Sequence, residues 1–205
     1  MTRHFILFIL LIHISTLSIA QKLGDYYVPI SIDSSQEGRL KFLSDSIAEI
    51  SSISRHMSPS IKAVYKYKST DTSIQMLLES ITKSNKHFTE IYAQSLTPIA
   101  KISLTKIDKG FIDHNNSLIY VRQKDFGKYP DIIYLIDGKK FIQDTGEQDG
   151  YGLVKKRPKT NKALEKKLKK FTKDNCTIEF VKGLNAYNRF GIKYVFGTIV
   201  ITSKE

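Results

Sequence analysis

Two kinds of hydrophobic spacing divide the chain. Between residues 34 and 98, apolar residues recur every three or four positions, as they do on one face of a helix. Ser34 and Glu37 have the spacing of a capping box, and Pro98 ends the pattern. We therefore expect a helix from 34 to about 56, a short strand at 61–68, and a second helix from 71 to 97. The residues of the two stripes are Leu40, Leu43, Ile47, Ile50 and Ile53, then Ile74, Leu77, Leu78, Ile81, Phe88 and Ile91.

After Pro98 the spacing changes to a period of two, which is typical of strands. Short strands are expected around 101–105, 118–121, 132–136, 178–182 and 198–202. Residues 143–162 are rich in glycine and polar side chains and predict a loop. A short amphipathic helix is expected at 161–172, with Leu164, Leu168 and Phe171 on its apolar face. The predicted fold class is α+β: a helix-rich amino-terminal region (21–98), followed by a mixed sheet with short helices (99–205).

The first 20 residues have the pattern of a secretory signal peptide. A basic start precedes an apolar stretch, and Ser18 and Ala20 supply the small side chains that signal peptidase requires. We expect cleavage after Ala20 and export; the alternative is an uncleaved anchor, for which the apolar run is short. The single cysteine, Cys176, excludes an intramolecular disulfide and is expected to be a buried or half-buried thiol.

Composition is that of an ordinary globular protein, with 41% hydrophobic and 25% charged residues, and this excludes wholesale disorder and collagen. The formal net charge of +12 is concentrated in one segment, residues 155–173, which holds ten basic residues and one acidic residue, Glu165. We call residues 155–173 the basic segment.

Two interpretations of the basic segment stay open. Its lysines are either an electrostatic patch for an anionic partner (lipopolysaccharide, phospholipid headgroups, an acidic glycan or an acidic protein) or a solvated helix face. Nucleic acid is not expected as a partner, because the chain is predicted to be exported and lacks interleaved base-stacking aromatics. The candidate binding residues are Lys155, Lys156, Arg157, Lys159, Lys166, Lys167, Lys169 and Lys170.

No catalytic or metal-binding motif is found in the sequence. His56, His87 and His114 have no metal-ligand spacing, and the segment Gly150–Gly152 lacks the context of a phosphate loop. We therefore expect neither enzymatic activity, nor a metal, nor a cofactor. A hydrolase would require the fold to bring scattered residues together, for example His87 or His114 beside a carboxylate.

Two passages in the last third of the chain resemble one family. Residues 132–138 read Ile-Ile-Tyr-Leu-Ile-Asp-Gly, and residues 178–191 read Ile-Glu-Phe-Val-Lys-Gly-Leu-Asn-Ala-Tyr-Asn-Arg-Phe-Gly, followed by Gly-Thr-Ile-Val-Ile-Thr-Ser-Lys at 197–204. Together they resemble the plug domain of TonB-dependent outer-membrane receptors of the Bacteroidetes type. The resemblance covers about a third of the chain, and the spacing from Lys182 to Lys204 matches without a gap.

The resemblance implies a plug-like mixed sheet with short helices, carrying the basic segment as an insertion. Its motif residues are expected to form the fold and to have no chemistry of their own. They are Asp137, Gly138, Lys182, Gly183, Ala186, Phe190, Gly191 and Gly197. Phe190 replaces the usual Tyr, and Phe196 takes a place often held by a smaller residue.

The function predicted from these features is a non-enzymatic interaction domain of the bacterial cell envelope. It is expected in the periplasm or at the periplasmic face of the outer membrane, with an envelope protein or an outer-membrane complex as its partner. We expect no transport activity, because a receptor barrel of 22 strands would take roughly 220 further residues. The alternative is a binder of anionic envelope polymers or lipids through residues 155–173.

Overall fold

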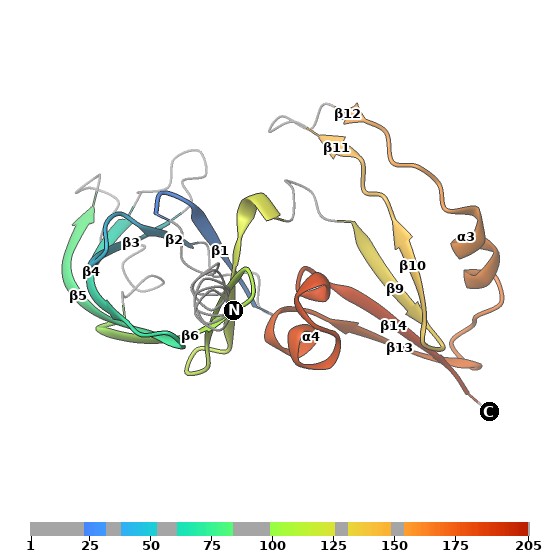
Figure 1. The fold of residues 1–205 in the computed structure, drawn as a ribbon. Helices are drawn as coiled ribbons and strands as arrows, with labels where there is room; N and C mark the ends of the chain where they lie inside the picture. Colours follow the sequence, from blue (N-terminus) through green and yellow to red (C-terminus); the bar gives the residue numbers. More distant parts are fainter. Residues whose placement is uncertain are drawn as a thin grey trace, which may run out of the picture. The chain divides into compact units, whose positions relative to one another are not determined.

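The computed structural model describes residues 23–31, 38–52, 61–83, 99–125, 131–148 and 154–204 (Figure 1). Strands take 55% of the described residues and helices 14%, so the predicted α+β class with a helical amino-terminal region is wrong. The chain divides into two compact units. Residues up to 116 make most of the first unit, and residues from 123 onward make most of the second.

The first unit is a closed barrel of eight strands, drawn in blue to yellow-green in Figure 1. Strands that follow one another in sequence lie side by side in the barrel, and the pairs from β1 to β7 are antiparallel. Closure leaves this sheet without an open edge. The strands are β1 (Tyr26–Ile30), β2 (Gly38–Phe42), β3 (Ile47–Ser52), β4 (Ile61–Ser69), β5 (Ser73–Lys83), β6 (Lys101–Ile107), β7 (Gly110–Asp113) and β8 (Leu118–Arg122), followed by the short 3₁₀ helix η1 (Gln123–Asp125).

Apolar side chains fill the inside of the barrel; they alternate with exposed ones in β4, whereas β7 and β8 are buried along their whole length. In β4 every second side chain from Ile61 to Tyr67 is buried, while the lysines between them are exposed. Four aromatic rings from different strands pack edge-on or tilted, with centroids 4.9 to 5.8 Å apart. They belong to Tyr27, Phe42, Tyr67 and Phe111. The barrel interior is a protein core of the kind that side chains fill in eight-stranded barrels.

The helix predicted from residue 34 to 56 is instead the β2–β3 hairpin in its described part. Leu40 pairs with Ile50 and Phe42 with Ala48, and Leu40, Phe42 and Ala48 are fully buried. The Ser44 hydroxyl oxygen accepts a hydrogen bond from the Ile47 amide (3.2 Å) and stabilises the turn. Phe42 and Ala48, whose side chains are buried inside the barrel, are therefore not part of the stripe predicted for a helix. Ser34, Glu37 and His56 lie outside the described residues.

The predicted second helix is also wrong, because residues 73–83 form β5. The true inward positions include Ile74 and Met76, both fully buried, whereas Leu77 and Ile81 of the helical stripe are 57% and 43% exposed. The register between β4 and β5 shifts between Val64 and Tyr65, which pair with Ser80 and Leu78. Glu79 is therefore an extra residue in β5, and it breaks the period of two. Residues 84–98 lie outside the described part of the chain.

The second unit contains a four-stranded mixed sheet in the order β10-β9-β14-β13 (Figure 1). β14 runs parallel to β9, and the two outer pairs are antiparallel. A small separate hairpin, β11–β12, lies within the stretch predicted as loop. The elements of this unit are β9 (Ile132–Ile136), β10 (Lys139–Gln143), β11 (Glu147–Gln148), β12 (Val154–Lys156), α3 (Lys162–Leu168), β13 (Cys176–Val181), α4 (Gly183–Phe190), the 3₁₀ helix η2 (Ile192–Tyr194) and β14 (Thr198–Ser203).

One helix packs on each face of this sheet. Leu164 of α3 is buried against Ile136, Cys176 and Ile201, with Leu168 and Phe171 beside it. On the opposite face lie Val181 and Thr198, which alternate with those strand residues, together with Ala186 of α4. The strands predicted at 132–136, 178–182 and 198–202 are therefore present, and the helix predicted at 161–172 is present but shorter.

The sequence also predicts a domain boundary and a signal peptide. The predicted boundary after residue 98 falls between β5 and β6, which are paired strands of one barrel. The predicted signal peptide, residues 1–20, lies outside the described residues. Among the residues that the structure does describe, no helix is long and apolar enough to cross a membrane.

Candidate binding surface

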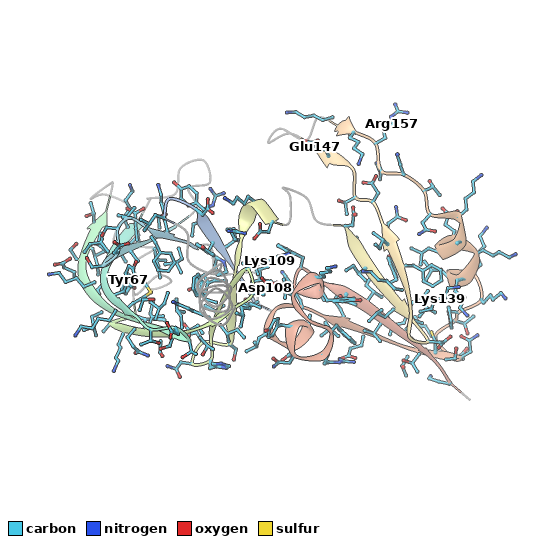
Figure 2. All side chains as sticks on the ribbon, viewed as in Figure 1. Tyr67, Asp108, Lys109, Lys139, Glu147 and Arg157 are labelled. Atoms are coloured by element: carbon cyan, nitrogen blue, oxygen red, sulfur yellow. The ribbon has the colours of Figure 1, made fainter. Side chains whose placement is uncertain are left out.

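The basic segment runs along the second unit through two ordered elements. It begins in β12, continues through residues 157–161 into α3, and ends in the turn that leads to β13 (Figure 1). Figure 2 shows the Arg157 side chain just beyond the end of β12, with Glu147 on the neighbouring strand β11. The lysines are therefore carried by defined secondary structure over much of the segment.

Asn161 fixes the start of α3. Its Oδ1 accepts a hydrogen bond from the Leu164 amide (3.0 Å), as an N-cap side chain does, and its Nδ2 donates to the Ile142 carbonyl of β10 (2.9 Å). Glu165 lies in the first turn, and Lys166 and Lys167 lie in the last turn, where a cation is favoured by the helix dipole. One residue thus caps the helix and attaches it to the sheet edge.

Asn175 and Cys176 fix the other end of the segment. Asn175 accepts a hydrogen bond from the Thr172 amide (2.7 Å) and donates to the Lys170 carbonyl (2.9 Å). The Cys176 thiol is free, buried, and donates to the Thr172 carbonyl (3.0 Å), which confirms the prediction of a buried thiol. The backbone that carries the last lysines is therefore closed by side-chain hydrogen bonds.

Two of the ten basic side chains in the segment pair with acids outside it. Lys156 lies 3.2 Å from Asp144, and Lys167 lies 3.7 Å from Asp137. The other eight are exposed and form no ion pair among the described residues. They are Lys155, Arg157, Lys159, Lys162, Lys166, Lys169, Lys170 and Lys173. The candidate residues are thus brought to the surface, with Lys156 and Lys167 engaged within the protein.

The two acidic partners are held in their charged form. The amide and hydroxyl of Ser203 hydrogen-bond the Asp137 carboxylate and, with Lys167 nearby, lower its pKa below the ordinary value. The pKa of Asp144 is lowered mainly by the Gly146 amide and then by Lys156. Both carboxylates are therefore ionised at neutral pH and anchor one lysine each.

Asp137 and Gly138 form the tight turn between β9 and β10, as the sequence predicts. Both have positive φ, 49° and 75°, the combination of a two-residue hairpin turn whose twist matches the flanking strands. The Asp137 carboxylate also reaches across to Ser203 at the end of the parallel strand β14. Asp137 therefore forms part of the β9–β10 hairpin turn and also hydrogen-bonds the end of β14.

The other motif residues build the connection from β13 through α4 to β14. Lys182 is the N-cap residue of α4, followed by Gly183. Ala186 is fully buried, and the ring of Phe190, the last helical residue, packs on Tyr194 (5.5 Å). The remaining two motif residues are Gly191, which follows α4 with φ 92°, and Gly197, which precedes β14 with φ 135°.

The histidine that the structure describes, His114, lies in no cluster of potential metal ligands. His114 is exposed in the turn between β7 and β8, and no group of three potential metal ligands is present in this part of the chain. His56 and His87 lie outside the described residues. The hydrolase alternative, which requires His87 or His114 beside a carboxylate, therefore stays a prediction.

The buried polar groups of the barrel strands include Asp113, Tyr65 and Tyr120. Asp113 accepts hydrogen bonds from the amide and the side-chain nitrogen of Asn116 (3.2 and 2.7 Å), which stabilises the β7–β8 turn. Burial raises the pKa of Tyr65 to about 12 and also raises that of Tyr120, to which Asp113 contributes. These phenols therefore stay protonated at neutral pH.

Two exposed apolar side chains on β13 were not identified from the sequence. Ile178 and Phe180 are 66% and 64% exposed, the largest values among the large hydrophobic residues that the structure describes. Ile178 and Phe180 lie on the same face of the strand as the buried Cys176, so the alternating pattern predicts that all three are buried. The pattern does not show that β13 is the last strand of the sheet. Their exposure follows from the position of β13 at the edge of the sheet.

Comparison with known proteins gives no relative for this chain: no protein-family model, curated protein or solved structure matches it.

Proposed function

We propose that the chain is a non-enzymatic interaction protein that binds an anionic partner through the basic segment, residues 155–173. The observation that carries this proposal is the set of eight exposed basic side chains without an acidic partner among the described residues. Like charges at this density repel one another, and an anionic partner relieves that repulsion.

The chemistry of the segment indicates what kind of anion suits it. Nine of its ten basic residues are lysines, which act as compact, hydrated charges and do not form the planar paired hydrogen bonds of arginine. Such a surface suits a partner with many spaced negative charges better than a single buried phosphate or carboxylate. The candidates are an acidic protein, an acidic glycan, and a surface of lipopolysaccharide or anionic phospholipid.

Charge reversal tests this proposal. A variant with Lys162, Lys166, Lys169 and Lys170 changed to Glu is compared with a variant carrying Arg at the same four positions. At low salt we expect the parent protein and the Arg variant to bind polyglutamate or lipopolysaccharide-containing vesicles, and the Glu variant to lose at least about 90% of that binding. Binding that is equal in all three proteins, or absent from all three, would contradict the proposal.

A second proposal concerns location and rests on a different feature, the resemblance of residues 182–204 in sequence to the plug domain of TonB-dependent receptors. We propose that the chain is exported and works in the periplasm or at the outer membrane by docking to an envelope protein. Amino-terminal sequencing after cell fractionation tests it. We expect a mature chain that begins at Gln21 in the envelope fractions; a cytoplasmic protein that begins at Met1 would contradict this proposal and leave the first untouched.

A further inference from the structure

The two edges of the mixed sheet differ in what covers them. β10 forms one edge, and residues before α3 bond to it: Asn161 donates to the Ile142 carbonyl (2.9 Å), and Gln143 donates to the Lys159 carbonyl (3.0 Å). β13 forms the other edge, and no described strand or loop pairs with its outer side. An uncovered edge presents backbone donors and acceptors to which another strand can add.

β13 also has few of the features that usually protect an edge strand. Residues 176–181 contain no lysine and no proline, and their register with β14 runs without a bulge. The one charged residue, Glu179, is paired with Arg189 of α4 (2.6 Å). By contrast, the covered edge strand β10 begins with the exposed residues Lys139 and Lys140 (Lys139 is labelled in Figure 2).

The exposed apolar side chains lie on one face of this open strand. Ile178 and Phe180 alternate with Glu179 and share their face with Cys176, which packs against Leu164 of α3. In the sheet, Ile178 pairs with Ile201 and Phe180 with Ile199. A strand added outside β13 would place its own apolar side chains beside Ile178 and Phe180 and extend this row.

Lysines flank the open strand at both ends. Lys173 precedes β13 and is exposed, and Lys182 follows it directly. Lys169, the C-cap residue of α3, and Lys170 come shortly before it, and the acids nearest in sequence are Asp174 and the paired Glu179. A segment that lies along β13 is therefore attracted if its ends are acidic and repelled if they are basic.

We propose that β13 binds an extended peptide segment of an acidic partner protein by strand addition, with apolar residues beside Ile178 and Phe180 and acidic residues at its two ends beside Lys173 and Lys182. This rests on the proposed function, since the basic segment supplies part of the attraction. A second copy of the chain fits less well, because each copy carries a net charge of +12. An anionic lipid surface would meet the lysines and the apolar pair but would leave the backbone edge without hydrogen-bonding partners.

The test uses the full chain and a synthetic peptide as long as β13, with alternating Val and Thr in its centre and Glu at both ends. A matched peptide with alternate backbone nitrogens methylated keeps the side chains and loses one edge of hydrogen bonds. The protein variants are Ile178→Thr with Phe180→Thr, which keeps strand propensity, and Ile142→Thr on the covered edge as the control. Circular dichroism checks that each variant is folded.

We expect the peptide to bind the parent protein and the Ile142→Thr control alike. Methylation of the peptide, or the Ile178→Thr and Phe180→Thr pair, should weaken binding at least about tenfold. The double variant Lys173→Glu with Lys182→Glu should also weaken peptide binding, and by a larger factor at low salt than at high salt. Equal binding of the methylated peptide, or no effect of the Ile178 and Phe180 changes, would overturn the inference.

Two further outcomes separate this inference from the proposed function. In the first, the charge-reversal variant at Lys162, Lys166, Lys169 and Lys170 loses polyglutamate binding, while the variant with Ile178→Thr and Phe180→Thr binds the peptide normally. The proposed function then holds and strand addition is wrong. If anionic phospholipid vesicles bind, neutral vesicles do not, and the peptide is not bound, the partner is a lipid surface and strand addition is again overturned.

Discussion

Asp137 shows how a single side chain connects several parts of the second unit. It occupies the first position of the β9–β10 turn, accepts hydrogen bonds from the amide and hydroxyl of Ser203 (2.8 and 3.0 Å), and holds Lys167 of α3 at 3.7 Å. Its hydrogen bonds to Ser203 are charge-assisted and therefore stronger than neutral ones. The sequence identified Asp137 as a turn residue, but its partners lie 66 and 30 positions away and no local pattern reveals them.

Asp137 also predicts a pH dependence of stability. Because its pKa is lowered in the folded protein, the stabilisation is present above its ordinary pKa of 3.8 and is lost as the pH falls through the folded value. Asp137→Asn keeps a residue that tolerates positive φ but removes the charge. We expect this variant to have a lower urea midpoint at pH 7 and a smaller fall in midpoint between pH 5 and 3. Asp131→Asn, at an exposed aspartate, is the control and should match the parent; an unchanged Asp137→Asn profile would contradict the assignment.

Elements differ in how well the sequence predicts them. The strands β6, β8, β9, β13 and β14 are predicted, as is α3, whereas β7, β10 and the β11–β12 hairpin are not. The helix predicted at 34–56 fails because its stripe combines residues of opposite environment, the buried Leu40 and the exposed Leu43. In the helix predicted at 71–97, Leu77 is exposed, and Leu78 and Ile81 lie on either side of the register shift in β5. A strand with an irregular register mixes periods, so pattern alone does not distinguish it from a helix. Barrel closure, which buries Ile74 and Met76, depends on pairings far apart in sequence and overrides the local pattern.

The candidate surface is likewise predicted in part. The sequence shows the lysine density of residues 155–173 and the apolar stripe of α3, and both are found in the structure. It does not show which lysines have acidic partners, because Asp137 and Asp144 approach Lys167 and Lys156 only in the folded sheet. Nor does it show which strand ends the sheet, and therefore that Ile178 and Phe180 are exposed.

Attachment of α3 to the sheet depends on Leu164, which is 2% exposed. Leu164→Ala removes a buried side chain and should destabilise the helix–sheet contact by about 3 kcal/mol, even though alanine favours helices. In hydrogen exchange, we expect the amides of α3 to lose about two orders of magnitude of protection. Lys166→Ala in the same helix is exposed and should change stability by less than about 0.5 kcal/mol. Equal protection in the two variants would show that Leu164 does not hold the helix.

At the scale of the whole molecule, charge and packing are divided between the two units. The first unit closes a barrel around an aromatic core and has no open edge. The second carries the basic segment and a sheet whose edge strand β13 is paired on its outer side with none of the described strands. The surfaces for which we propose binding thus belong to the second unit. For the first unit, the testable property is the contribution of its closed barrel to the stability of the chain.

Closure of the barrel depends on a close approach between β7 and β8. A Cβ added at Gly110 would overlap the backbone carbonyl of Tyr120 and lie 3.3 Å from the Cα of Val121, and backbone atoms move aside only if the strands separate. We expect Gly110→Ala to destabilise the chain by about 3 kcal/mol, measured by urea unfolding with far-ultraviolet circular dichroism. The matched control is Gly38→Ala in β2, where the new methyl group would lie an ordinary 3.5 Å from Ile50 and should be neutral or slightly stabilising. If both substitutions are neutral, β7 and β8 do not approach each other as closely as in the structure; if only Gly110→Ala destabilises, the close approach of these two strands is required for a stable barrel.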